Sequence, residues 1–143
     1  VDPKWLKDTL DKSGIRWRVI VISACYSGSF VPALQDDNTL IITASAADRA
    51  SFGCSNEADY TYFGRAFFDQ AMREQTSVSA AFEQTKGTVA QWEKAQGFEA
   101  SEPQWSIGKN MEFMLPQLEQ RLFPVTSKTE MKIETPQLNV QTQ

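Results

Sequence analysis

Two short segments of the chain are mostly apolar and rich in β-branched side chains, and each predicts a buried strand. Residues 18–24 and 39–45 do not alternate polar and apolar positions as a half-exposed strand does. Continuous runs of this kind are typical of parallel sheets that helices cover on both faces. We therefore expect the two segments to be parallel neighbours in one sheet.

Helical periodicity fills most of the chain around these strands. The first helix should begin at Asp2-Pro3, a capping side chain followed by proline, and end at Gly14. Apolar residues recur at helical spacing in three later segments: 60–74, 78–92 and 111–122. This order of elements predicts an α/β layered domain with a parallel sheet. Because strands buried on both faces need neighbours on each side, we expect further strands of the sheet to precede Val1.

The composition predicts one domain followed by a tail. Hydrophobic residues make up 41% of the 143 residues, enough to bury a core, and the net charge of -4 is mild. Residues 101–108 should form an extended segment and turn, and residues 1–123 should form the domain. Residues 124–143 are mostly polar and predict a linker or a disordered tail.

Several kinds of partner are not expected. The chain has no cluster of Lys and Arg that would indicate nucleic acid, and its longest apolar run is too short to span a bilayer. Two cysteines 29 positions apart and the absence of histidine match no metal site, and no cofactor is expected. The same absence excludes Cys-His catalysis by the residues of this chain alone.

Cys25 is the residue most suggestive of chemistry. It lies where the first predicted strand ends, and ligands of open parallel sheets bind outside the carboxyl ends of the strands. Gly28 would allow the backbone to pass close to a substrate, and the Cys25 amide could face a developing oxyanion. The alternative is that Cys25 and Cys54 are small buried apolar side chains, and this is the interpretation we favour for Cys54.

The residues around Cys25 resemble a known nucleophile motif. Val21-Ile-Ser-Ala-Cys-Tyr-Ser-Gly-Ser29 is similar to the motif of the legumain, or asparaginyl endopeptidase, family, and caspases carry a related one. Further elements of the family pattern follow in order: Thr43-Ala44-Ser45, Arg49, Ser51 to Cys54, and Tyr62-Phe63-Gly64. The resemblance implies a caspase-like three-layer sandwich with a mainly parallel sheet.

The resemblance also implies an activity, the hydrolysis of peptide or protein substrates by a cysteine endopeptidase. Cys25 would be the nucleophile that forms an acyl-enzyme, with Ser27 and Gly28 supporting the loop or the oxyanion. The family's His-Gly, which supplies the general base, lies upstream, about 50 residues away in caspases. We therefore expect an amino-terminal half of the same domain to be missing here, and the chain alone to be inactive.

Two positions depart from the legumain pattern. Tyr26 follows the nucleophile where legumains have Glu, and Arg65 stands where they have an Asp that helps to recognise asparagine. The resemblance makes Ser45, Ser51 and Arg65 candidate residues of the substrate pocket. A buried guanidinium at position 65 would favour an acidic residue before the scissile bond. The alternative is that Arg65 turns outward to solvent on its helix.

Two other functions remain open from the sequence. The chain could belong to a non-catalytic pseudo-peptidase that keeps the fold and binds a partner. A His-Gly located 40 to 50 residues before Cys25 would distinguish the enzyme from this binding module. An unrelated α/β hydrolase is disfavoured, because Ala24-Cys-Tyr-Ser-Gly28 lacks the glycine that precedes the nucleophile in that fold's elbow motif.

Overall fold

The first helix, α1 (Pro3–Ser13), has the two ends that its sequence predicts. The Asp2 carboxylate accepts a hydrogen bond from the Lys4 N–H at 3.0 Å, and Gly14 ends the helix in the left-handed conformation with a φ of 76°. The computed structural model describes residues 1–52 and 61–123, without the side chain of Leu122. Cys54 and the predicted tail at 124–143 therefore lie outside the described residues.

Three strands form one sheet: β1 (Arg18–Ile22), β2 (Thr39–Thr43) and β3 (Gln104–Ile107), in the order β1-β2-β3. β1 and β2 are parallel with Ile20 opposite Ile41, which confirms the predicted pairing. β3 is antiparallel to β2, with Trp105 opposite Ile42. The described sheet is therefore mixed, and the expectation of a mainly parallel sheet is not confirmed.

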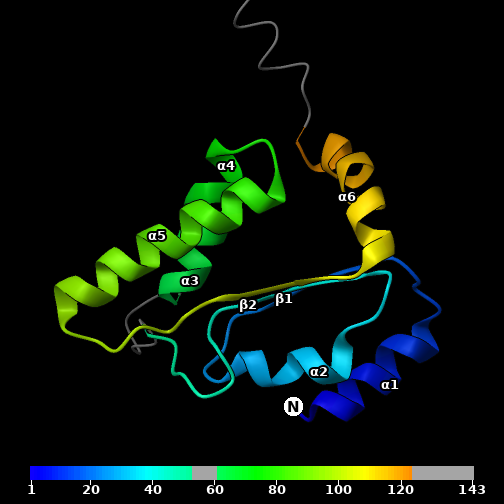
Figure 1. Cartoon of the computed structure of the whole chain (residues 1–143), viewed down its shortest axis with the longest axis horizontal. Helices are drawn as coiled ribbons and strands as arrows, with labels where there is room; N and C mark the ends of the chain where they lie inside the picture. Colours follow the sequence, from blue (N-terminus) through cyan, green and yellow to red (C-terminus); the bar gives the residue numbers. More distant parts are fainter. Residues whose placement is uncertain (53–60, 124–143) are drawn as a thin grey trace, which may run out of the picture.

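The direction of β3 follows from where the chain enters it. The preceding helix, α5 (Val78–Gln96), ends near the carboxyl edge of the sheet (Figure 1). There the Ala46 N–H donates to the Ser101 carbonyl at 2.9 Å, which ties the segment before β3 to the residues after β2. A strand that starts at this edge must run against β2.

The remaining elements are short or form one segment with mixed winding. A 3₁₀ turn and a one-turn helix follow β1: η1 (Ser27–Phe30) and α2 (Val31–Leu34). Three consecutive elements then form the 62–74 segment: α3 (Tyr62–Gly64), the π-helical η2 (Arg65–Ala71) and α4 (Met72–Glu74). The last described helix is α6 (Lys109–Leu122), which remains one helix although it contains Pro116.

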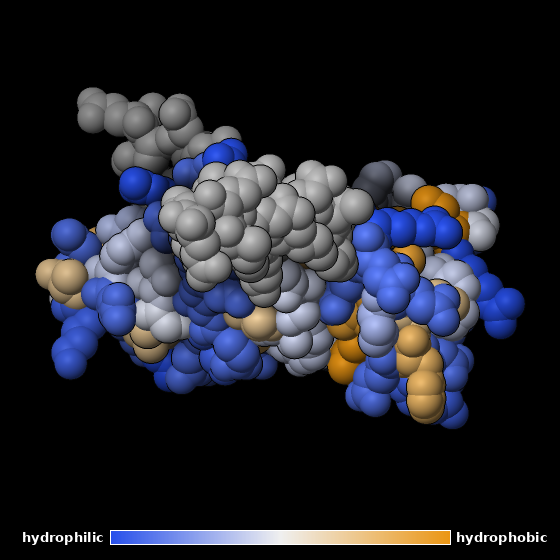
Figure 2. Space-filling model, turned by 90° about the horizontal axis from the view of Figure 1, so that it is seen from above, coloured by the Kyte–Doolittle hydropathy of each residue, from blue (hydrophilic) through white to orange (hydrophobic). Residues whose placement is uncertain are grey.

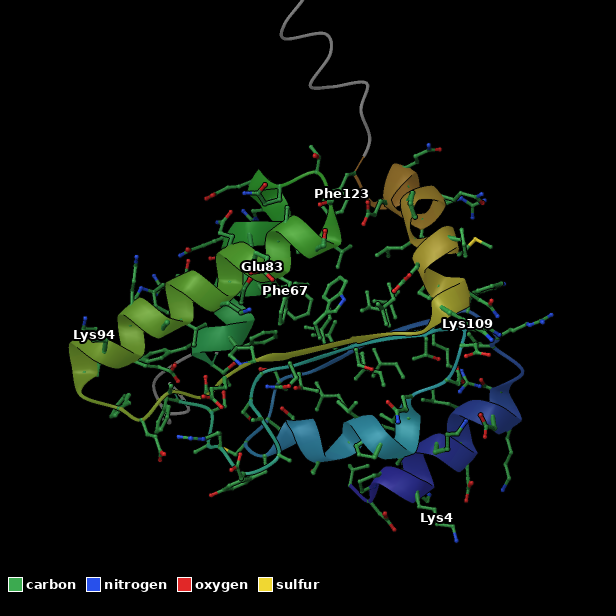
Figure 3. All side chains as sticks on the ribbon, in the orientation of Figure 1. Lys4, Phe67, Glu83, Lys94, Lys109 and Phe123 are labelled. Carbon is green, nitrogen blue, oxygen red and sulfur yellow. The ribbon has the colours of Figure 1, made fainter. Side chains whose placement is uncertain are left out.

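The elements form three layers, with α1 and α2 on one face of the sheet and the 62–74 segment, α5 and α6 on the other (Figure 1). Every residue of β2 is buried. Its Leu40 and Ile42 join the main core with apolar residues of the helices, among them Phe67, which lies between the helices and the sheet in Figure 3. This arrangement agrees with a layered α/β domain.

β1 is less buried than its sequence predicts. Only Arg18 of its five residues is buried, and Val19 is 41% exposed. The reason is that no described strand pairs with the outer edge of β1. Trp17, which precedes β1, and α6 line a hollow of about 660 Å³. Viewed from above, hydrophobic surface gathers at the end of the molecule that carries α6 (Figure 2).

Candidate functional site

Cys25 lies at the carboxyl edge of the sheet, three residues after the end of β1, as the sequence predicts. It is exposed, and no disulfide occupies its sulfur. The parallel neighbour β2 ends at Thr43, so the residues that follow β2 reach the same edge. Two segments distant in sequence thus meet at the candidate nucleophile.

The Cys25 thiol forms hydrogen bonds with the backbone of Ser51. The Ser51 N–H donates to Sγ at 3.2 Å, and Sγ donates to the Ser51 carbonyl at the same distance. Donation by the N–H favours a thiolate, whereas donation by the sulfur requires the protonated thiol. Sγ thus acts as both donor and acceptor toward the backbone of the same residue.

The turn after Cys25 has an unusual backbone. Tyr26 adopts a φ of 58°, a left-handed conformation that costs a residue other than glycine about 1–2 kcal/mol. Its N–H donates to the Arg49 carbonyl at 2.8 Å, and its carbonyl accepts from the Ser29 N–H at 3.0 Å. Surrounding hydrogen bonds thus hold a conformation that the local sequence does not favour.

Ser27 and Ser45, predicted to support the loop and to line the pocket, are both completely buried. The Ser45 hydroxyl donates to the Ala24 carbonyl at 3.1 Å and accepts from the Ser27 N–H at 3.2 Å. The Ser45 N–H in turn donates to the Ser27 hydroxyl at 3.3 Å. The Ser45 side chain therefore points toward the Ala24–Ser27 turn, which contains Cys25.

Gly28 is also buried, and its lack of a side chain is required by the chain itself. A Cβ atom at this position would lie 2.6 Å from the Ala47 nitrogen and 2.8 Å from the Ala46 carbonyl carbon. The close approach at Gly28 is thus made by the loop after β2.

Arg65 lies at the start of η2 and is exposed, which agrees with the alternative that its side chain turns outward to solvent. The guanidinium lies 5.6 Å from the centroid of the Trp92 ring on α5, a cation–π contact. The first turn of the 62–74 segment is nevertheless close to β1, since a Cβ on Gly64 would lie 3.7 Å from the Ser23 hydroxyl. Ser51, the other candidate for the pocket, is 7% exposed.

Two features of this region were missed from the sequence. The Thr61 hydroxyl lies 2.7 Å from that of Ser23 and accepts from the Gly64 N–H at 2.9 Å. Threonine before a helix is a recognised capping signal, but nothing in the sequence indicates its contact with Ser23. Four aromatic rings also form a chain beside Ser51: Phe52, Phe98, Tyr62 and Trp92.

Charged side chains also form ion pairs near the carboxyl edge of the sheet. The Arg49 guanidinium pairs with Glu99 and lies 3.8 Å from a Glu102 carboxylate oxygen, so it joins the loop after β2 to the segment after α5. Within residues 1–52 and 61–123, no three side chains of the metal-binding types are grouped closely enough to hold an ion. None of the described helices is both long and apolar enough to cross a membrane.

Comparison with known families gives one match. The model of the peptidase C13 family matches residues 1–114, which contain Cys25 and all of the candidate pocket residues. No protein among the curated ones matches the chain. The residues around Cys25 resemble those of legumain-like cysteine peptidases, and the family match confirms this resemblance.

Proposed function

The chain belongs to the peptidase C13 family, and on this premise we propose that it is a cysteine endopeptidase domain that uses Cys25 as its nucleophile. Membership alone implies a cysteine peptidase in general terms. The observation that supports the specific proposal is the exposed Cys25 thiol at the carboxyl edge of two parallel strands, in a turn fixed by surrounding hydrogen bonds.

The proposed reaction begins with removal of the Cys25 proton by a general base. The thiolate attacks the carbonyl carbon of the scissile peptide bond, and the Ser51 N–H stabilises the thiolate before attack. The Cys25 N–H is available to the oxyanion, since it donates to no described residue. The C–N bond then breaks, the leaving amine takes the proton from the base, and water hydrolyses the thioester.

We propose that the base is a histidine from a segment upstream of Val1. The 143 residues contain no histidine, and none of the described side chains contacts Sγ in a position to act as the base. The open outer edge of β1 and the partly exposed Val19 support a place for additional strands of the same sheet. The same upstream segment would supply both the histidine and the additional strands.

The test compares the 143-residue chain with the complete protein that includes the upstream segment. We expect the complete protein to hydrolyse a quenched-fluorescence peptide library and to be alkylated rapidly by iodoacetamide at Cys25. The chain alone should show neither, because its thiol has no base. Cys25→Ser in the complete protein is the matched control and should abolish hydrolysis while leaving the circular dichroism spectrum unchanged.

Two results would contradict this proposal. A complete, folded protein without Cys25-dependent hydrolysis would instead indicate a non-catalytic member that binds its partner. Rapid hydrolysis by the 143 residues alone, lost in Cys25→Ser, would show that the base is not an upstream histidine. An acyl-enzyme mass adduct on Cys25 after acid quenching would support the covalent step directly.

A further inference from the structure

The buried Ser45 hydroxyl forms hydrogen bonds with both ends of the turn that carries the candidate nucleophile. The Ser45 hydroxyl donates to the carbonyl of Ala24, the residue before Cys25, and accepts from the N–H of Ser27, two residues after it. A hydroxyl has one proton and two lone pairs, so both bonds can form at once. The ends of the Ala24–Ser27 turn are therefore fixed to the same oxygen.

Ser45 is itself held rigidly in the sheet region. Its N–H donates to the Ser27 hydroxyl at 3.3 Å, and its carbonyl accepts from the Thr43 hydroxyl at 2.9 Å. Both Ser27 and Ser45 are inaccessible to solvent, so water does not compete for these bonds. These hydrogen bonds thus fix the turn after β1 relative to the end of β2.

The turn needs such support because of Tyr26. Its left-handed backbone, with a φ of 58°, is disfavoured for tyrosine, and it sets the direction in which the chain continues from Cys25 into the turn. The Arg49 carbonyl fixes only the Tyr26 N–H. Without the Ser45 hydroxyl, the flanking groups of Ala24 and Ser27 would lose their shared partner, and the turn could relax.

We propose that Ser45 is a positioning residue, which holds the Cys25 amide and thiol so that both face the same substrate carbonyl. This inference rests on the proposed peptidase function. It assigns Ser45 the role of supporting the turn that contains Cys25, instead of contacting substrate in the pocket. Because bond formation tolerates little misplacement, a shift of about 1 Å reduces rates by up to about 100-fold.

The test uses the complete protein and the variant Ser45→Ala. We expect kcat to fall about 10- to 100-fold, with KM within about twofold and the pH dependence of kcat/KM unchanged. Ser27→Ala should have a smaller effect. It removes a hydroxyl that accepts from the Ser45 N–H and lies 3.4 Å from the Ser45 hydroxyl, but it leaves the bonds of the Ser45 hydroxyl to the Ala24 carbonyl and the Ser27 N–H in place. Should Ser45→Ala not fold, Ser45→Cys, a weaker donor and acceptor, provides the same comparison under reducing conditions.

Thr85→Val is the matched control for loss of a buried hydroxyl. Thr85 is equally buried, but its hydroxyl donates to the Ala81 carbonyl within α5. It should lower Tm to a similar extent and leave kcat unchanged. A folded Ser45→Ala variant with normal kcat, or an equal loss of kcat in Thr85→Val, would overturn the positioning role. A parent protein without Cys25-dependent hydrolysis would overturn the proposed function and this role with it.

Discussion

The groups that form hydrogen bonds at Cys25 and its turn are uncharged. Its thiol exchanges hydrogen bonds with the backbone of Ser51, and its turn is tied to Ser45 and to the Arg49 carbonyl. These groups orient the sulfur and accept or donate single hydrogen bonds, but none of them changes charge near neutral pH. The described residues thus orient the sulfur, and under the proposed function another group would transfer the proton.

Arg65 gives a specificity prediction at the scale of one residue. Because its guanidinium is exposed, an ion pair with a substrate carboxylate is worth about 0.2–1 kcal/mol, or up to about fivefold in kcat/KM. We expect the complete enzyme to cleave after Asp or Glu up to about fivefold faster than after Asn or Gln. Arg65→Ala should remove this ratio, as measured with matched peptides.

Arg73→Ala is the control for net charge, because Arg73 lies on the same 62–74 segment and pairs with Asp69 at 3.4 Å. It should leave the ratio unchanged. A preference for Asn that is the same in the parent and in Arg65→Ala would show that Arg65 takes no part in substrate recognition and serves only to stack on Trp92.

At the scale of elements, Arg18 joins α1 to the start of β1. Its side chain is buried and donates to the carbonyls of Leu10 and Ile15 and to the Asp11 carboxylate at 3.0 Å. The Leu10 carbonyl belongs to the last four residues of α1, whose carbonyls have no N–H partner within the helix. The strand thus begins with a residue that also caps the preceding helix.

The Asp11 contacts predict how stability depends on pH. Hydrogen bonds from Lys7, and then from Arg18, lower the pKa of Asp11 below its ordinary value of 3.8. A lowered pKa in the folded state adds stability above pH 3.8 that is lost as the pH falls through the folded-state pKa. We therefore expect Asp11→Asn to lower the urea midpoint near neutral pH and to have no effect in strong acid.

The control for this measurement is Asp8→Asn, which removes a carboxylate from α1 that forms no ion pair with the described residues. It should leave the difference between neutral and acidic midpoints as in the parent protein. An equal destabilisation by Asp11→Asn at both pH values would mean that its hydrogen bonds, and not its charge, support α1.

The elements themselves were largely predictable, because their signals are local. Asp2 caps the first helix as expected, and the two apolar strands pair in parallel. The π-helical winding of η2 and the exposure of β1 were not predictable, since both depend on neighbours distant in sequence or outside the described residues. At the site, the sequence indicates Cys25 itself, but not that Ser45 points toward its turn.

On the scale of the whole molecule, none of the described strands pairs with the outer edge of β1. The Arg18 N–H donates to the Asn38 carbonyl, and the Ile22 carbonyl accepts from the Ala44 N–H. Backbone groups in a parallel ladder face alternate sides, so those of residues 18, 20 and 22 face β2. The N–H groups of Val19 and Val21 therefore face the open edge.

This alternation predicts a pattern of hydrogen exchange. If upstream strands complete the sheet, hydrogen exchange of the Val19 and Val21 amides should be at least about 10-fold slower in the complete protein than in the 143-residue chain. The Ile20 and Ile22 amides are internal controls, because they already bond to β2, and should change less. Equal exchange of Val19 and Val21 in both proteins would show that no strand pairs with this edge.

The tight fit at Gly28 limits how the specificity of this protein could be engineered. The loop after β2 is joined to the nucleophile turn along its length, through Ala46 and Ala47 at Gly28, the Arg49 carbonyl, and Ser51 at the thiol. A transplanted loop of another length would move the nucleophile as well as the pocket. Redesign should therefore keep the loop backbone and exchange accessible side chains, such as that of Asp48.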